Sequence, residues 1–192
     1  MTVRRDTRNE VLELAEKLFH ERGFRGFSYA DIAGPMGIKP AAIHYHFQGK
    51  EELGVAIIER IRDRLKQAQT RFVADQTPWT GQLEFLFNYY RRHGANNCGV
   101  CAVGVSAIEA DSIPHSMQIQ VRLLIKEVLN ALVQILARGR DAGQFEFEGR
   151  ADERATLVLA ALGGALQLQR LTGLPQLETV IAEIEQGLAV TS

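Results

Sequence analysis

The chain has 192 residues, of which 46% are hydrophobic and 23% are charged, and its formal net charge is −1 at pH 7. These proportions are typical of a globular protein and exclude a disordered, collagen-like or membrane-embedded chain. The charge is divided unevenly. Residues 1–50 contain eight Lys or Arg and six Asp or Glu, whereas residues 51–192 contain fourteen Lys or Arg and seventeen Asp or Glu. A mildly basic front and a mildly acidic remainder are compatible with DNA contact by the front alone.

The sequence contains no candidate membrane span. Residues 155–168 form the most apolar stretch, and Gly163, Gly164 and Gln167 interrupt it. The charged first ten residues are not followed by the apolar segment that a secretory signal requires. We therefore expect a cytoplasmic protein without a membrane partner.

Three short helices are expected within the first 50 residues. Along the first helix an apolar face repeats at helical spacing, at Val11, Leu14, Ala15, Leu18 and Phe19. Gly23 ends this helix, and Ser28 with Asp31 has the spacing of a capping box at the start of the second, which Gly37 closes. A third helix is expected over about residues 39–47. Two short helices joined by a glycine turn predict a helix-turn-helix.

The rest of the chain is also expected to be helical. A long helix opens at Lys50 and repeats apolar residues every four positions, at Leu53, Ile57, Ile61 and Leu65. Further helices are expected over about 79–93, 100–110, 115–139, 151–171 and 176–189. Residues 145–148 alternate like a strand but are too few to carry a sheet. The predicted fold is all-α, an N-terminal three-helix helix-turn-helix head on a C-terminal helical bundle body, with about nine helices.

An ordered set of residues between positions 7 and 53 carries a family resemblance. It comprises Leu18-Phe19, Gly23-Phe24, Asp31-Ile32-Ala33, Gly37-Ile38, Ile43, Tyr45-His46-Phe47, and Lys50-Glu51 before Leu53. This set closely resembles the N-terminal domain of TetR-family (TetR/AcrR-type) transcriptional regulators. The resemblance implies a DNA-binding domain over residues 1–50 and a ligand-sensing and dimerisation domain over residues 51–192. It also implies a homodimer that binds a palindromic operator in double-stranded DNA and is released by a small-molecule effector.

The third helix has the composition of a recognition helix, because base edges in the major groove require short or polar side chains. Lys39, Pro40, Ala41 and His44 meet this requirement, whereas Ile43 and Phe47 are expected to face inward. The resemblance places phosphate contacts at Ser28, Tyr29, Tyr45, His46 and Lys50. For Tyr45 and His46 the alternative is packing, and for Lys50 it is a solvated position at a helix start. Arg4, Arg5 and Arg8 form either a DNA-binding arm or a solvated tail.

Several positions depart from the family pattern. Lys39 stands where a small hydroxyl residue commonly caps the recognition helix, Ala41 replaces a frequent glycine, and His44 replaces the commonest tyrosine. Pro35 falls inside the second helix, where its missing N–H tends to end or kink the helix. These departures leave the operator sequence open.

The last two long helices are the expected dimer contact. The last helix places Leu177, Val180, Ile181, Ile184 and Leu188 on one stripe. In the family the last two long helices pair with their copies, and Leu162 and Ile184 are expected to lie in that contact. A wholly intramolecular core is the alternative.

An effector pocket is expected within the helices between about residues 79 and 171. Its candidate lining residues are Phe85, Tyr89, Cys98, Cys101 and Met117, with Trp79 as a further candidate. Aromatic residues at helical spacing are also what a core requires, so packing is the alternative for each of them. The sequence does not identify the ligand.

Cys98 and Cys101 have the spacing of a redox pair, of half a metal site, or of two buried thiols. A redox pair of the thioredoxin type requires a βαβ context, and a zinc site requires about four ligands; neither is found in the sequence. We expect structural burial, no metal and no cofactor. A thiol or electrophile sensor acting through Cys98 and Cys101 is the alternative to release by a small-molecule inducer.

Two other classes of protein are the alternatives to a ligand-responsive repressor. An enzyme is not expected, because no nucleophile–base arrangement, paired-carboxylate motif or phosphate-binding loop is found. A helical adaptor without DNA binding would differ from a regulator in lacking salt-dependent affinity for DNA.

Overall fold

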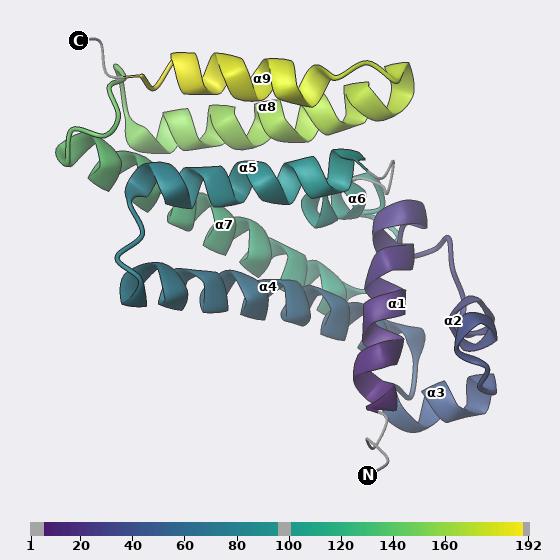
Figure 1. The fold of residues 1–192 in the computed structure, drawn as a ribbon. Coiled ribbons are helices and arrows are strands. Elements are labelled where there is room, and N and C mark those ends of the chain that lie inside the picture. Colours follow the sequence, from purple (N-terminus) through teal and green to yellow (C-terminus); the bar gives the residue numbers. More distant parts are fainter. Residues whose placement is uncertain (1–5, 96–100, 190–192) are drawn as a thin grey trace.

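The computed structural model describes residues 6–95 and 101–189. Within these ranges the chain forms nine α-helices and no strand, which confirms the predicted all-α fold (Figure 1). The helices are α1 Thr7–Arg22, α2 Tyr29–Met36, α3 Pro40–His46, α4 Lys50–Ala74, α5 Trp79–Ala95, α6 Ala102–Ile108, α7 His115–Asp141, α8 Ala151–Thr172 and α9 Gln176–Gln186. The expected boundaries are met to within a few residues, and α9 ends three residues earlier than expected.

The helices α1 to α3 form the predicted head. The Ser28 backbone N–H donates to Asp31 Oδ2 over 2.8 Å and its hydroxyl donates to the same oxygen over 2.6 Å, so the capping box opens α2 as expected. Gly37 closes α2 with φ +66°, a left-handed conformation that favours glycine and turns the chain directly into α3. Pro35 lies in the last turn of α2, and the helix continues only to Met36, as expected of a residue that has no N–H to donate.

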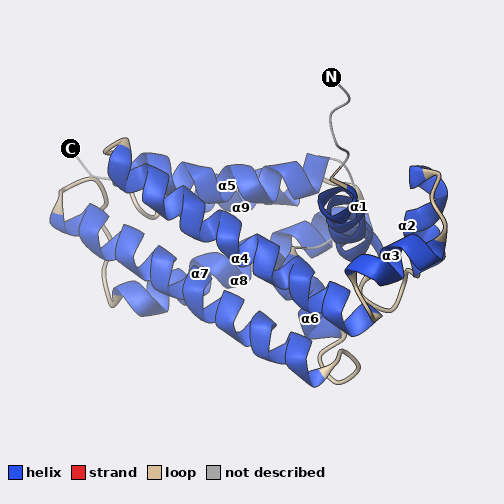
Figure 2. Cartoon of the chain, turned by 90° about the horizontal axis from the view of Figure 1, so that it is seen from below, coloured by secondary structure: helices blue, strands red, loops and turns tan. Residues whose placement is uncertain are grey.

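Two hydrophobic cores hold the molecule together. The first contains buried residues of α1 to α4 together with residues of α6 and of the first half of α7. The second contains residues of α5, the second half of α7, α8 and α9. Figures 1 and 2 place α1 to α3 at one end of the molecule, with the long helices α4 and α7 extending away from them. The boundary expected at residue 50 falls at the first residue of α4, and the first core lies on both sides of it.

The head is fixed to the body at specific contacts. Gly54 of α4 lies so close to Phe24 and Met117 that a β-carbon there would stand 2.7 Å from the Phe24 ring and 2.8 Å from the Met117 sulfur. Glu109, just after α6, accepts from the backbone N–H of Phe24 over 2.5 Å and of Arg25 over 3.1 Å. Glu109 and Met117 therefore attach α6 and α7 to the segment between α1 and α2.

Among the described helices, none combines the length and the apolar character that crossing a bilayer requires.

Candidate DNA interface and effector cavity

The recognition helix α3 presents its short and polar residues to solvent. Ile43 and Phe47 are completely buried in the first core, which confirms that this face of α3 points inward. The predicted base-reading residues are all exposed: Lys39, Pro40, Ala41 and His44. Tyr45 is 86% exposed, so its packing alternative does not apply within this chain. His46 is half-buried, and its ring meets the Tyr45 ring edge-on at 5.2 Å.

Two of the predicted phosphate-contact residues are engaged inside the head. The Tyr29 hydroxyl donates to the Phe47 carbonyl over 3.0 Å, and its ring lies edge-on against His44 at 4.6 Å. Burial and the charge of Glu52 raise the pKa of Tyr29, so the hydroxyl keeps its proton for this bond. Tyr29 thereby holds α3 against α2, whereas Ser28 lies exposed at the start of α2.

The Lys50 ammonium also has partners within the head. It donates to the Phe27 carbonyl and lies 4.6 Å from the Phe27 ring centre and 4.9 Å from that of Phe24. Burial lowers the pKa of Lys50, and the charges of Glu109 and Asp31 oppose this shift. A DNA phosphate would therefore have to share this ammonium with the Phe27 carbonyl.

The N-terminal arginines are only partly covered by the structure. Arg4 and Arg5 lie outside the described residues. The Arg8 guanidinium lies 4.9 Å from the centre of the Phe47 ring, at the start of α1 and close to α3. Its contact with a core residue of the head places this positive charge beside the recognition helix.

A cavity of about 840 Å³ lies between α1, α4, α5, α7 and α8. The residues that line it include Phe85, Tyr89, Cys101 and Trp79. Met117 does not: it is completely buried in the first core, against Phe24 and Gly54, so its prediction as a lining residue was wrong. Apolar residues at helical spacing serve a core and a cavity equally well, and the sequence does not separate the two.

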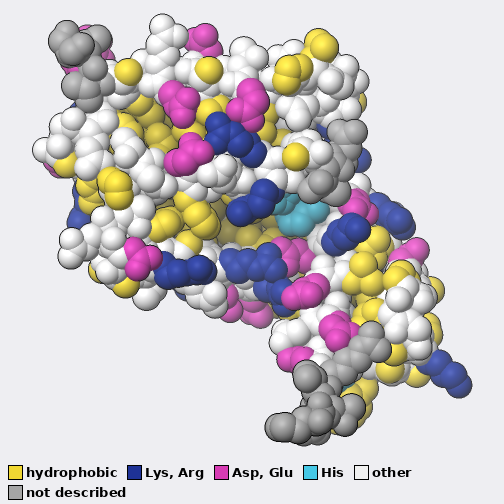
Figure 3. Space-filling model, viewed as in Figure 1, with side chains coloured by type: hydrophobic (Ala, Val, Ile, Leu, Met, Phe, Trp, Pro, Cys, Tyr) yellow, Lys and Arg dark blue, Asp and Glu magenta, His cyan; other side chains and the backbone are white. Residues whose placement is uncertain are grey.

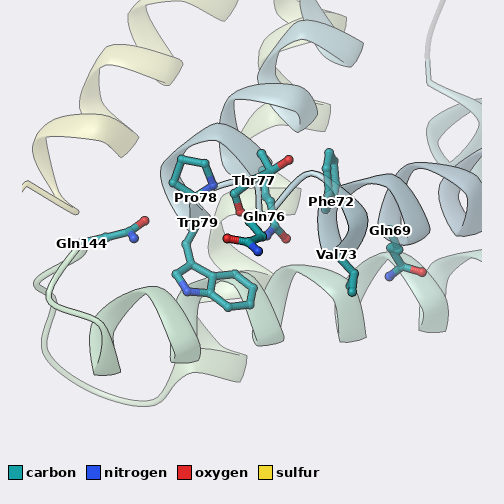
Figure 4. Close-up of a pocket in the computed structure, with 9 residues that line it drawn as sticks. Gln69, Phe72, Val73, Gln76, Thr77, Pro78, Trp79 and Gln144 are labelled. Carbon is teal, nitrogen blue, oxygen red and sulfur yellow. Dashed lines mark hydrogen bonds between the residues drawn. The ribbon is translucent and has the colours of Figure 1, made fainter.

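The cavity has an apolar part and a polar end. Figure 3 shows hydrophobic side chains in a hollow on this face of the molecule, with histidine and charged side chains at its end toward the head. Five aromatic residues line the cavity: Phe72, Trp79, Phe85, Tyr89 and Tyr90. A smaller pocket of about 410 Å³ lies at the turn between α4 and α5 and shares Gln69, Phe72, Trp79 and Gln82 with the large cavity. Figure 4 shows residues that line this smaller pocket.

Helix α1 of the head contributes to the polar end of the cavity. Glu16 and His20 are buried, and both line the cavity together with Arg64 of α4 and His93 of α5. The His20 and His93 rings meet at 4.6 Å, and His93 Nδ1 lies 2.8 Å from the Tyr89 carbonyl oxygen. Burial lowers the pKa of His93. Glu16, His20, Arg64 and His93 were not predicted from the sequence, although a Glu and a His four residues apart on the inward face of an apolar helix were a usable signal.

The structure describes only one of the two cysteines, Cys101. Cys98 lies outside the described residues. Cys101 is buried at the start of α6, where its sulfur accepts from the Gly104 N–H over 3.4 Å. Burial raises the pKa of the Cys101 thiol, which lowers the fraction of reactive thiolate. Cys101 is thus a buried side chain that also lines the cavity. In the described part of the chain, no three His, Cys, Asp or Glu side chains gather as a metal site would require.

An apolar stripe runs along the outer face of α8. Leu157, Leu168 and Leu171 are each more than half exposed, and a β-carbon at Gly164 between them would meet open space. Leu162, expected in a dimer contact, is instead completely buried in the second core of its own chain, so that expectation was wrong. Ile184 is half-buried against the same core. A helix that is apolar nearly all round does not reveal which face is turned outward.

Known proteins resemble this chain in the head and in the body. The model of the family described as "Bacterial regulatory proteins, tetR family" matches residues 11–57. The HTH-type transcriptional repressor NemR of Escherichia coli K12 is 26% identical over 192 residues, covering 96% of this chain and 94% of that protein. A TetR transcriptional regulator from Legionella pneumophila superimposes with a TM-score of 0.84 at 26% identity, over 98% of this chain and 100% of that one. The repressor KstR2 of Rhodococcus jostii is 34% identical over 109 residues, 56% of this chain and 50% of that protein.

Proposed function

The chain is a TetR-family transcriptional regulator, and from this we propose that it is a homodimeric repressor released from a palindromic operator by a small molecule bound in the 840 Å³ cavity. One observation carries the proposal: α1 belongs both to the head that presents α3 and to the wall of the cavity. A ligand in the cavity therefore contacts the DNA-binding head directly. Relatives across most of the chain are themselves named as transcriptional regulators, which supports a regulator and not an enzyme.

In this proposal residues 1–50 bind DNA. The exposed positions of α3 read bases, and Tyr45, His46 and Ser28 contact phosphates. Tyr29 and Lys50 act from inside the head, because their hydrogen bonds to the Phe47 and Phe27 carbonyls fix α3 and the start of α2. Lys50 contributes positive potential to the interface as well.

Residues 51–192 sense the ligand and form the dimer. The outer leucines of α8 pair with the same face of a second copy, with α9 beside them, because a stripe of exposed leucines is costly to leave in water. Two heads on one rigid dimer reach two half-sites of a palindrome. Ligand then favours a separation of the heads that does not match these half-sites.

A role for His44 in reading a base can be tested by replacing it with alanine. His44 is exposed on α3, so we expect His44→Ala to fold normally and to lose its preference at one base pair of each half-site. Affinity for that site should fall by about tenfold, with little change on random DNA. Binding to an operator panel that varies each base pair in turn measures the preference.

His115→Ala is the matched control, because His115 is exposed on α7, outside the head. It should leave both affinity and base preference unchanged. An unaltered preference profile for His44→Ala would remove His44 from the base-reading set.

A further inference from the structure

The polar end of the cavity contains a buried carboxylate bound by an arginine that reaches solvent. Glu16 of α1 accepts from both terminal nitrogens of Arg64, over 2.5 and 2.9 Å, in a two-pronged ion pair. The Glu16 side chain is 10% exposed, whereas that of Arg64 is 52% exposed. Both residues line the cavity. A guanidinium in this geometry is a receptor for one carboxylate, and here the protein itself supplies that carboxylate.

The pair also joins the head to the body, since α1 carries Glu16 and α4 carries Arg64. Arg60, one turn earlier on α4, adds a contact of 3.3 Å from its Nε to Glu16 Oε2. The Arg60 side chain also binds Glu13 of α1 over 2.8 Å. Arg60 therefore remains a cationic neighbour of Glu16 once the bond between Glu16 and Arg64 is broken.

Three cationic side chains line the cavity, Lys17, Arg64 and Arg92, and of these Arg64 is the one that holds a buried carboxylate in two-pronged geometry. Glu127 of α7, which also lines the cavity, is held by Arg62 of α4 over 2.6 and 2.9 Å, and this ion pair lowers the pKa of Glu127. Lys17 lies 3.9 Å from Glu21 and its side chain is largely exposed. The remainder of the wall is mainly aromatic and aliphatic, including Phe85 and Trp79. An apolar chamber that ends at a solvent-reaching guanidinium fits an apolar molecule with one anionic group.

We propose, on the basis of the effector role assigned to the cavity above, that its ligand is an apolar carboxylic acid whose carboxylate replaces Glu16 on Arg64. The exchange conserves charge, because one carboxylate leaves the guanidinium as another arrives. Glu16, which keeps Arg60 and His20 as neighbours, moves toward water and carries α1 with it. Ligand binding thereby weakens the attachment of the head to α4, which is how occupancy of the cavity reaches the DNA.

The test compares 2-naphthoate with 2-naphthamide, which have the same shape and differ in charge. Calorimetric titration of the full chain should show naphthoate binding at least about tenfold more tightly than the amide. Arg64→Gln should abolish this preference, whereas Arg71→Gln, an exposed arginine on the same helix that does not line the cavity, should keep it. Equal affinity for acid and amide in the wild type, or an unchanged preference in Arg64→Gln, would overturn the proposal.

Competition between ligand and Glu16 has its own readout. In Glu16→Gln the neutral amide competes less for Arg64, so naphthoate should bind several-fold more tightly while the affinity for naphthamide stays the same. Weaker naphthoate binding in Glu16→Gln, with an unchanged melting temperature, would show that Glu16 helps to hold the ligand and would overturn the exchange.

A neutral probe separates this inference from the proposed function. N-phenyl-1-naphthylamine, which fluoresces in apolar surroundings, should bind the wild type and be excluded by Leu159→Trp, which fills the chamber wall from α8. Failure of the neutral probe to bind would count against the effector cavity itself. Binding of the probe without any preference for naphthoate would refute the carboxylate exchange alone.

Discussion

Leu171→Glu is expected to give a folded monomer that has lost operator binding. Leu171 is 83% exposed on α8, so the fold of a single chain does not need it. Leu168, nearly one turn earlier on the same stripe, is 54% exposed. In the proposed dimer these leucines meet their copies, and two glutamates would bring unpaired charges into an apolar contact.

Loss of the dimer should reduce operator affinity by roughly 100-fold or more, because the second head no longer benefits from attachment to the first. Sedimentation velocity at micromolar concentration measures the assembly, and circular dichroism checks the helix content. Val73→Glu is the matched control: Val73 is 81% exposed, but on α4, and its replacement should leave the dimer intact. A dimeric Leu171→Glu, or a monomeric wild type, would contradict the assignment of this face.

Phe47→Ala is expected to produce the largest loss of stability. Phe47 is completely buried at the end of α3, in the core shared by α1 to α4, α6 and α7. Truncation of a fully buried phenylalanine lowers the free energy of unfolding by about 3–5 kcal/mol, from lost burial and the cavity that remains. Because Phe47 anchors the recognition helix, operator binding should be lost at temperatures where α5 to α9 remain helical.

Guanidinium unfolding followed by circular dichroism measures this loss. Phe85→Ala removes the same side chain from a cavity wall, where it is 41% exposed, and should cost less than about half as much. Equal losses for the two variants would contradict the anchoring role of Phe47.

The head was predictable because its signals are local. Ser28 with Asp31 and the glycine at position 37 mark the ends of α2, and the inward face of α3 follows from Ile43 and Phe47. The partners of Tyr29 and Lys50 were not predictable, since the Phe47 and Phe27 carbonyls are distant in the sequence and carry no side-chain signal. Both residues were therefore assigned to DNA contact without their roles inside the head.

The helices of the body were predictable from the sequence, but the faces that they bury and expose were not. Leu162 and Leu171 belong to the same nearly all-apolar helix, and only packing separates the buried leucine from the exposed one. The ion pair between Glu16 and Arg64 joins residues 48 positions apart and depends on how α1 crosses α4. Helical periodicity contains no information on such a crossing.

Selection from a random duplex library tests sequence-specific DNA binding by this chain most directly. The full-length protein should enrich a palindrome whose half-sites are separated by about one helical turn. On that palindrome it should bind as a dimer or a pair of dimers, with the logarithm of affinity falling linearly with the logarithm of salt concentration. A pool that remains random after repeated rounds, or affinity that does not respond to salt, would contradict a DNA-binding regulator.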